Sequence, residues 1–289
     1  MNKGVIREVK EMMKLNPKYM LSDLKKAIEK ATVIINAIND GTFKGKIFKY
    51  GNLKLEKNIA RFTLPEVITC KARCPGCYAS KMLWETTRVY RLTNLLLVVN
   101  ALKDVDFNNK LTKYIQKELQ LHKKKCEKAG KLPMFRWHDS GDIFSLTYFD
   151  WMRDIMHVNL GIKFYTYTKN VQVYQKYKEL KEIGIPMYNF NIVNSFILNH
   201  VNYFDFIHNF ENEFNTFQSI IETLRRQEKK LYFCNYNFEK LKSSDCKNYE
   251  KLIQYFKDND DVISFSEKHL ECGDCSACCS FEYTAFLKH

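Results

Sequence analysis

The sequence predicts an α/β protein whose mostly parallel sheet is either open or curled into a barrel. From about residue 59 onward, short apolar, β-branched or aromatic runs alternate with longer stretches of helical periodicity. The chain has 289 residues, of which 45% are hydrophobic, so it can bury a full core. Polar side chains capable of chemistry follow the end of each of the first five predicted strands, where sites on such sheets are built.

The elements follow in order along the chain. Residues 1–45 are expected to form two amphipathic helices, the second starting near Ser22 and running to Gly41. The expected strands are Ile59–Val67, Met134–His138, Lys163–Thr168, Met187–Val193, Leu231–Tyr236 and Val262–Ser266. Helical stretches are expected near residues 80–128, 146–158, 171–183, 213–228 and 247–257. Right-handed crossovers would then place the carboxyl ends of the strands on one rim.

Charge and apolar patterning bound the class of function. No apolar run approaches a membrane span, and the longest, Leu95–Val99, reads as a buried helix segment. The first eight residues are charged too early for a signal peptide, so a cytoplasmic location is expected. The formal net charge of +13 suits a nucleic-acid or other polyanionic partner. It also accompanies the Lys, Asn and Ile bias of AT-rich genomes, and both explanations stay open.

Three cysteines stand on one short loop after the first predicted strand: Cys70, Cys74 and Cys77. In a reducing compartment such thiols are expected to bind metal rather than to form disulfides. Three thiolates can hold three irons of a four-iron cluster and leave the fourth iron open to a small molecule. Zinc would need a fourth ligand, which the loop lacks before Glu85 but a distant residue could supply. The spacing favours an iron–sulfur cluster over zinc, and both over a core without metal.

A second cysteine cluster lies near the carboxyl terminus. Cys272, Cys275 and Cys278 are separated by two residues each, so their thiolates can converge on one metal. Cys234 or Cys246 would complete a four-cysteine site, and the adjacent Cys279 is a further candidate. Such a site would hold an auxiliary iron–sulfur cluster or a structural zinc ion, which spacing alone does not separate.

Polar motifs follow the later strands. His138–Asp142 comes after the second strand, and Lys169 follows the third, sharing a strand face with Tyr165 and Tyr167. A lysine beside aromatic rings suits a phosphate or a carboxylate, although it could also be a solvated lysine. His138 equally suits a hydrogen-bonded core histidine, and the Asp-Ser-Gly-Asp run equally suits a turn before a helix capped near Ser145.

The cysteine spacing after the first strand resembles that of the radical S-adenosylmethionine (SAM) superfamily. Over about residues 55–280 the chain is also similar to the phage gene product 88 family, a group of radical-SAM-like proteins. That similarity rests on Cys77–Lys81, Arg136–Asp142, Phe164–Lys169 and the C-terminal Cys272–Cys278. The resemblance implies a partial (βα)6 TIM-like barrel at residues 51–268 and a C-terminal cysteine-rich metal-binding segment at 269–289. The N-terminal helices lie outside the resemblance, and the sequence pattern predicts them as a helical extension at residues 1–50.

The resemblance also implies cofactors and residue roles. A 4Fe-4S cluster on Cys70, Cys74 and Cys77 would bind SAM, and an external electron donor would reduce it. The implied SAM contacts are Tyr78, Ser140, Gly141, Asp142, Asn191 and Ser195. The residues expected to act in catalysis are His138, Asp139 and Lys169. Together with the positive net charge, the resemblance points to a nucleic acid, a nucleotide or a base as substrate, with a peptide still open. The expected location is the cytoplasm of a phage-infected or prophage-bearing bacterial host.

Two alternatives from other classes remain. One is a zinc-stabilised nucleic-acid-binding protein without catalysis, which the basic charge also suits. The other is a degenerate relative that binds a cluster but has lost SAM chemistry. Gly76 keeps this second alternative open, because the superfamily usually has an aromatic residue at that position. The sequence does not determine the substrate, the reductant or the oligomeric state.

Overall fold

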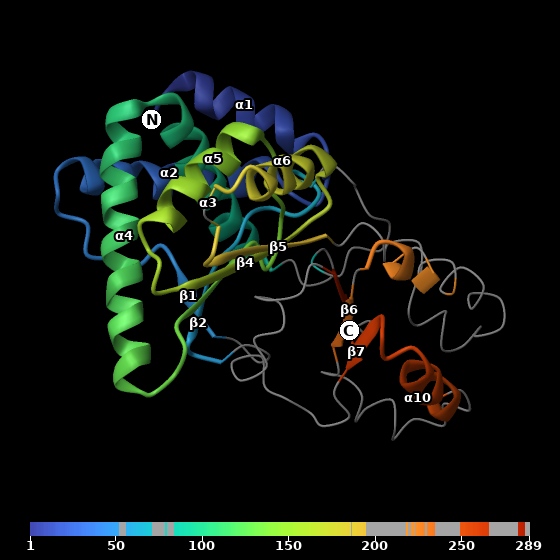
Figure 1. Ribbon diagram of the computed structural model, residues 1–289. Helices are drawn as coiled ribbons and strands as arrows, with labels where there is room; N and C mark the ends of the chain where they lie inside the picture. Colours follow the sequence, from blue (N-terminus) through green and yellow to red (C-terminus); the bar gives the residue numbers. More distant parts are fainter. Residues whose placement is uncertain are drawn as a thin grey trace.

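A computed structural model gives the arrangement of the chain. It describes residues 1–51, 56–70, 79, 84–185, 187–194, 218, 221–222, 224–228, 230–234, 249–265 and 283–286. Within these residues a layer of helices covers one face of a five-stranded sheet, and a smaller sheet with its own helix lies beyond the last strand (Figure 1). The predicted α/β class with a parallel sheet is confirmed.

The larger sheet has the order β1-β2-β3-β4-β5. Its strands are β1 (Lys49–Tyr50), β2 (Ile59–Phe62), β3 (Met134–Trp137), β4 (Lys163–Thr168) and β5 (Phe190–Asn194). All neighbours from β2 to β5 are parallel, and only β1, which the sequence pattern did not indicate, is antiparallel. Strand β2 ends earlier than expected, because Pro65 cannot donate to a ladder and the backbone turns at residues 66–68.

The helices agree with the predicted stretches, with one division. They are α1 (Lys3–Met13), α2 (Leu21–Asn39), α3 (Glu85–Lys103), α4 (Val105–Lys128), α5 (Leu146–His157), α6 (Val171–Glu182) and α10 (Tyr249–Asp258). The stretch expected at residues 80–128 is two helices, because Asp104 ends α3 and its side chain caps α4 by accepting from the Phe107 N–H at 3.0 Å. Ser145 caps α5 as the sequence indicated.

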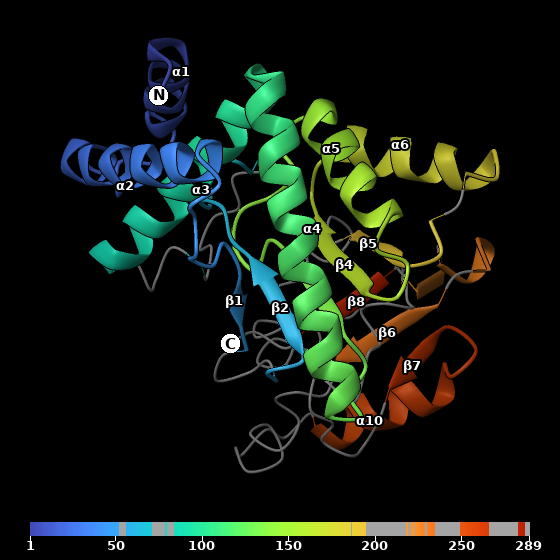
Figure 2. The same ribbon diagram turned by 90° about the vertical axis from the view of Figure 1, so that its left-hand side faces the viewer.

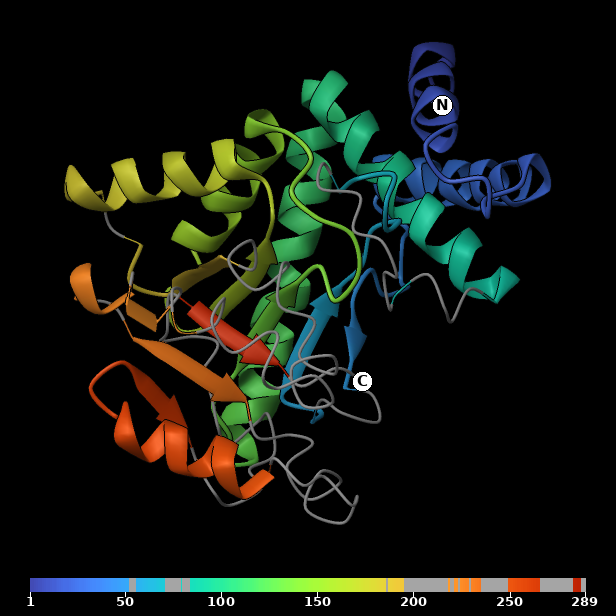
Figure 3. The ribbon, with the colours of Figure 1, turned by 90° about the vertical axis from the view of Figure 1, so that its right-hand side faces the viewer.

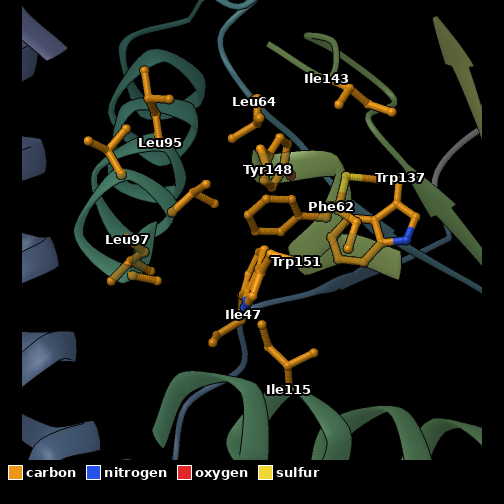
Figure 4. Close-up of a cluster of buried hydrophobic side chains, with 14 of the residues drawn as sticks. Ile47, Phe62, Leu64, Leu95, Leu97, Ile115, Trp137, Ile143, Tyr148 and Trp151 are labelled. Carbon is orange, nitrogen blue, oxygen red and sulfur yellow. The ribbon is translucent and has the colours of Figure 1, made fainter. Parts of the chain in front are cut away.

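The main core lies between the sheet and the helices, and it also includes the N-terminal helices. Phe62, Trp137 and Tyr148 meet there with apolar side chains of α3 and α4 (Figure 4). Helix α3 is buried along most of its length, with α2 packed against it, and Figure 2 shows α4 in front of the sheet. Buried residues of α1 and α2, such as Val9 and Ala31, belong to the same cluster. The N-terminal helices are therefore continuous with the main core.

The smaller sheet has the order β7-β6-β8. Its strands are β6 (Leu231–Cys234), β7 (Ile263–Phe265) and β8 (Tyr283–Phe286), and both neighbours run parallel to β6. Strand β8 was not expected from the sequence; it is the edge strand of the smaller sheet and contacts β5 of the larger one (Figure 3). Among the described helices, none combines the length and the apolar character needed to cross a membrane.

Candidate functional site at the carboxyl edge of the sheet

The first predicted metal ligand lies at the carboxyl edge of the parallel sheet. Cys70 lies in the connection between β2 and α3 and is partly exposed. The other predicted residues of this loop, Cys74, Cys77 and Tyr78, lie outside the described residues, as do Ser195, Cys246, Cys272, Cys275 and Cys278. Cys234 is the last residue of β6, of which the backbone is described. Among the described residues, no three His, Cys, Asp or Glu side chains are grouped as a metal site would need.

The connections after β2 and β3 are joined directly next to Cys70. The Leu64 N–H donates to the Ser140 carbonyl at 2.9 Å, and the Asp142 N–H donates to Thr69 Oγ1 at 3.1 Å. Thr69 Oγ1 in turn donates to the Pro65 carbonyl at 2.7 Å. The predicted Ser140–Asp142 segment is thereby held against the residue that precedes Cys70.

Gly141 is the residue that permits this contact. Its φ is +82°, and a Cβ built there would lie 2.7 Å from both Leu64 Cβ and Thr69 Oγ1. Only glycine combines this backbone conformation with so close an approach. Packing of the β3 connection against Leu64 and Thr69 therefore explains why residue 141 is glycine. The SAM contact that the resemblance implies for Gly141 stays a prediction.

A buried ion pair holds the cysteine loop on both of its sides. The Glu66 side chain is 1% exposed, and its Oε2 accepts from Arg91 Nη1 at 2.5 Å and from the Tyr19 hydroxyl at 2.8 Å. Arg91 Nη1 also donates to the carbonyl of Ala79, two residues beyond Cys77, at 3.3 Å. Arg91 of α3 thus contacts the chain both before Cys70 and after Cys77.

Glu66 has further acceptor capacity at this place. Ser140 Oγ donates to its Oε2 at 3.4 Å, whereas its Oε1 is buried and has no hydrogen-bond partner among the described residues. Burial next to this carboxylate raises the pKa of Tyr19, so that hydroxyl stays a donor. Sequence reasoning missed this cluster, because neither its spacing nor its composition forms a known motif.

Asp142 links the segment that follows β3 to the segment that follows β4 by hydrogen bonds. Its carboxylate accepts from the Ile143 N–H and Thr168 Oγ1, both at 2.7 Å, and from the Lys169 N–H at 2.9 Å. Burial raises the pKa of Asp142 to about 6, although these donors act in the opposite direction. Asp142 therefore fixes the backbone of Lys169. The SAM contact expected for Asp142 stays a prediction.

His138 faces the helix layer. It is 3% exposed, and its Nε2 lies 2.8 Å from the Tyr148 hydroxyl of α5, with Nδ1 3.3 Å from Thr166 Oγ1. Burial, with a smaller contribution from Arg136, lowers the pKa of His138 to about 3, so the imidazole is neutral. These contacts match the core-histidine alternative, and a catalytic role for His138 stays a prediction.

The face of the sheet opposite the helices carries a row of cations. Lys49, Arg61 and Arg136 are direct lateral partners on β1, β2 and β3, and we call them the basic row. Arg61 forms an ion pair with Asp139, one of the three residues expected to act in catalysis. The sequence signal was present, since Arg61 and Arg136 each interrupt a buried strand, but their lateral register could not be read from it.

Asn191 continues the row on β5. It is the lateral partner of Tyr165 in β4, which is itself the partner of Arg136. The Asn191 Oδ1 accepts from the Tyr177 hydroxyl of α6 at 3.5 Å. The structure thus brings Cys70, Asp139–Asp142 and Lys169 together at one edge, with Asn191 farther along the sheet.

The fold and the site define an α/β protein with a parallel sheet and a cysteine-bearing loop at its carboxyl edge. The sequence matches the family model described as gene product 88 over residues 35–280. The chain belongs to the gene product 88 family, as its motifs predicted. No curated protein and no solved structure was found to match it.

Proposed function

We propose that this protein is an iron–sulfur, SAM-dependent radical enzyme. One observation carries the proposal: Cys70, the first of three cysteines in a three-two spacing, lies at the carboxyl edge of a parallel sheet beside a glycine-containing connection. Sites on parallel α/β sheets form at this edge. The proposal includes a partial barrel built on the larger sheet and a second cysteine-ligated metal in the C-terminal segment.

Features of Cys70 and its surroundings support the proposal of a cluster on this loop. Thiolates are the soft ligands that iron–sulfur clusters prefer, and Cys70 is partly exposed rather than sealed in the core. Arg91 holds the chain on both sides of the loop through Glu66 and the Ala79 carbonyl. When bound, the reduced cluster supplies the electron that cleaves SAM.

The protein's own residues would position the reactants. Gly141 lets the backbone of the β3 connection approach the loop, and Asp142 fixes Lys169 at the same edge. Asp139 is held by Arg61, so its carboxylate keeps one orientation. An external donor would supply the electron, and we place the reaction in the cytoplasm of a phage-infected or prophage-bearing bacterium.

The test is metal analysis of anaerobically reconstituted protein together with a SAM cleavage assay. We expect a brown protein with iron and sulfide in equal amounts, which converts SAM to 5′-deoxyadenosine when reduced. Replacing Cys70, Cys74 and Cys77 together by serine should abolish cleavage. Cys126→Ala is the matched control, because this thiol is buried on α4, next to His122.

Three outcomes separate the candidate functions. Iron and sulfide with SAM cleavage support the proposal. Iron and sulfide without SAM cleavage identify a relative that holds a cluster but has lost SAM chemistry, as Gly76 allows. Zinc without iron or sulfide, and no cleavage, contradicts the proposal and favours a zinc-stabilised nucleic-acid-binding protein.

A further inference from the structure

Arg61 and Arg136 of the basic row lie on the face of the sheet opposite the core helices, and Lys49 is the lateral neighbour of Arg61 on the edge strand β1. Ala60 and Phe62 of β2 and Phe135 and Trp137 of β3 pack toward the helices, so the alternate residues Arg61 and Arg136 point to the other face. Lateral partners on neighbouring strands have Cα atoms about 5 Å apart. Three cationic side chains therefore stand close together on three adjacent strands.

Each member of the row has described contacts that orient it. The Arg61 guanidinium pairs with Asp139, and its Nε donates to the Gly51 carbonyl at 3.3 Å. The Arg136 guanidinium lies 5.0 Å from the centre of the Tyr167 ring. The Lys49 ammonium lies 3.9 Å from the centre of the Tyr90 ring. Arg–aromatic stacking orients Arg136 and a cation–π contact orients Lys49, whereas Arg61 is held by the carboxylate of Asp139.

The charges of Lys49 and Arg61 lie close enough to act on each other. The pKa of Lys49 is lowered first by partial desolvation and then by the charge of Arg61. Like charges at directly opposed positions of a sheet repel one another. An anion bound along the row would relieve this repulsion and accept hydrogen bonds from the guanidinium and ammonium groups.

Aromatic rings lie next to the cations on the same face. Tyr165 is the lateral partner of Arg136, and the Tyr165 and Tyr167 rings meet edge to face with centres 6.1 Å apart. Cations that bind phosphate, combined with aromatic rings that contact bases, are the two elements of nucleotide recognition. A carboxylate ligand would use the cations but has no need of the rings.

We infer that Lys49, Arg61 and Arg136 bind the phosphate of a nucleotide whose base lies against Tyr167. The ion pair between Arg61 and Asp139 links the basic row to the segment after β3, which packs beside Cys70. The nucleotide would be the substrate of the radical chemistry proposed above, and the assignment as substrate rests on that proposed function. Binding itself needs neither SAM nor a reductant, so it can be measured independently.

The experiment is isothermal titration of the full-length reconstituted protein at fixed low salt. The probes are thymidine 5′-monophosphate, thymidine, and an eight-residue thymidylate single strand. The variants are Lys49→Gln and Arg136→Gln, with Lys124→Gln as the control. Lys124 is exposed on α4, in the helix layer that covers the opposite face, so the control removes the same charge away from the row.

We expect the monophosphate to bind the wild type and each row variant to raise its Kd at least about tenfold, because a charged hydrogen bond is lost. Thymidine should bind weakly and equally to all variants, and Lys124→Gln should match the wild type. If only the thymidylate single strand binds, and Arg136→Gln weakens its binding, the phosphate that the basic row binds is that of a nucleic-acid strand.

Three results would overturn the inference. The first is that neither phosphate-bearing probe binds the wild type. The second is that both row variants bind these probes as tightly as the wild type does. The third is that Lys124→Gln weakens binding as much as the row variants do, which would show a general charge effect. Lys49 lies on an edge strand at an exposed position, so its variant tests the inference even if Arg136→Gln fails to fold. SAM cleavage without nucleotide binding would leave the proposed function standing and refute this inference alone.

Discussion

Arg91→Met would remove the cation that neutralises Glu66 in the protein interior. The two side chains are 10% and 1% exposed, and the carboxylate would keep only neutral donors, the hydroxyls of Tyr19 and Ser140. Removing one partner of a buried ion pair costs about 3–5 kcal/mol, because a charge is left without compensation in a medium of low polarity. We expect Arg91→Met to lower the free energy of unfolding by about 3 kcal/mol or more.

The double variant Glu66→Met/Arg91→Met distinguishes this mechanism from a simple loss of contacts. With both charges gone, the remaining cost is the loss of hydrogen bonds to Tyr19, Ser140 and the Ala79 carbonyl, each worth about 1 kcal/mol. The double variant should therefore be at least as stable as Arg91→Met alone. The two substitutions should be non-additive by about 3 kcal/mol.

The assay is urea denaturation of the full-length protein followed by circular dichroism. Arg225→Met is the matched control, because Arg225 forms a well-aligned but exposed pair with Asp261, and its loss should lower the free energy of unfolding far less than Arg91→Met does. Additive losses in the double variant would refute the reasoning, since they would show that the charges do not interact in the folded protein. The double variant should also retain less iron, because the cysteine loop loses its contact with α3.

Two further predictions concern the connection after β3. Gly141→Ala should lower the free energy of unfolding by about 3 kcal/mol or more, because the new Cβ meets Leu64 and Thr69 in addition to the backbone strain. Gly184→Ala, at φ +77° but with open space around it, should lower it by about 1 kcal/mol. Equal losses for the two variants in thermal denaturation would argue against the close approach at Gly141. His138 has a folded pKa of about 3, below its unfolded value, so the unfolded state binds its proton first and stability falls as the pH drops below about 6.5. The stability of the wild type relative to His138→Asn should thus rise by about 1.4 kcal/mol per pH unit from pH 4.5 to 5.5, and a pH-independent difference would contradict a buried neutral imidazole.

The sequence by itself determined the elements and the motif. The alternation of short β-rich runs with helical stretches gave the parallel sheet from Ile59 to Asn194, since the side-chain period reports burial within each segment. The cysteine spacing and the Asp-Ser-Gly-Asp run were visible for the same reason, because each lies within a few residues of chain. Family membership followed from these local patterns.

Only the tertiary structure decided what these segments contact. The partners in the Tyr19–Glu66 bond are 47 residues apart, and those of Glu66–Arg91 are 25 apart, so no local pattern encodes them. Strand register likewise placed Lys49 and Arg61 side by side and put β8 next to β6, because lateral pairing depends on how whole strands align. Packing against α5 also gave His138 a neutral, buried environment that its place at a strand end left open.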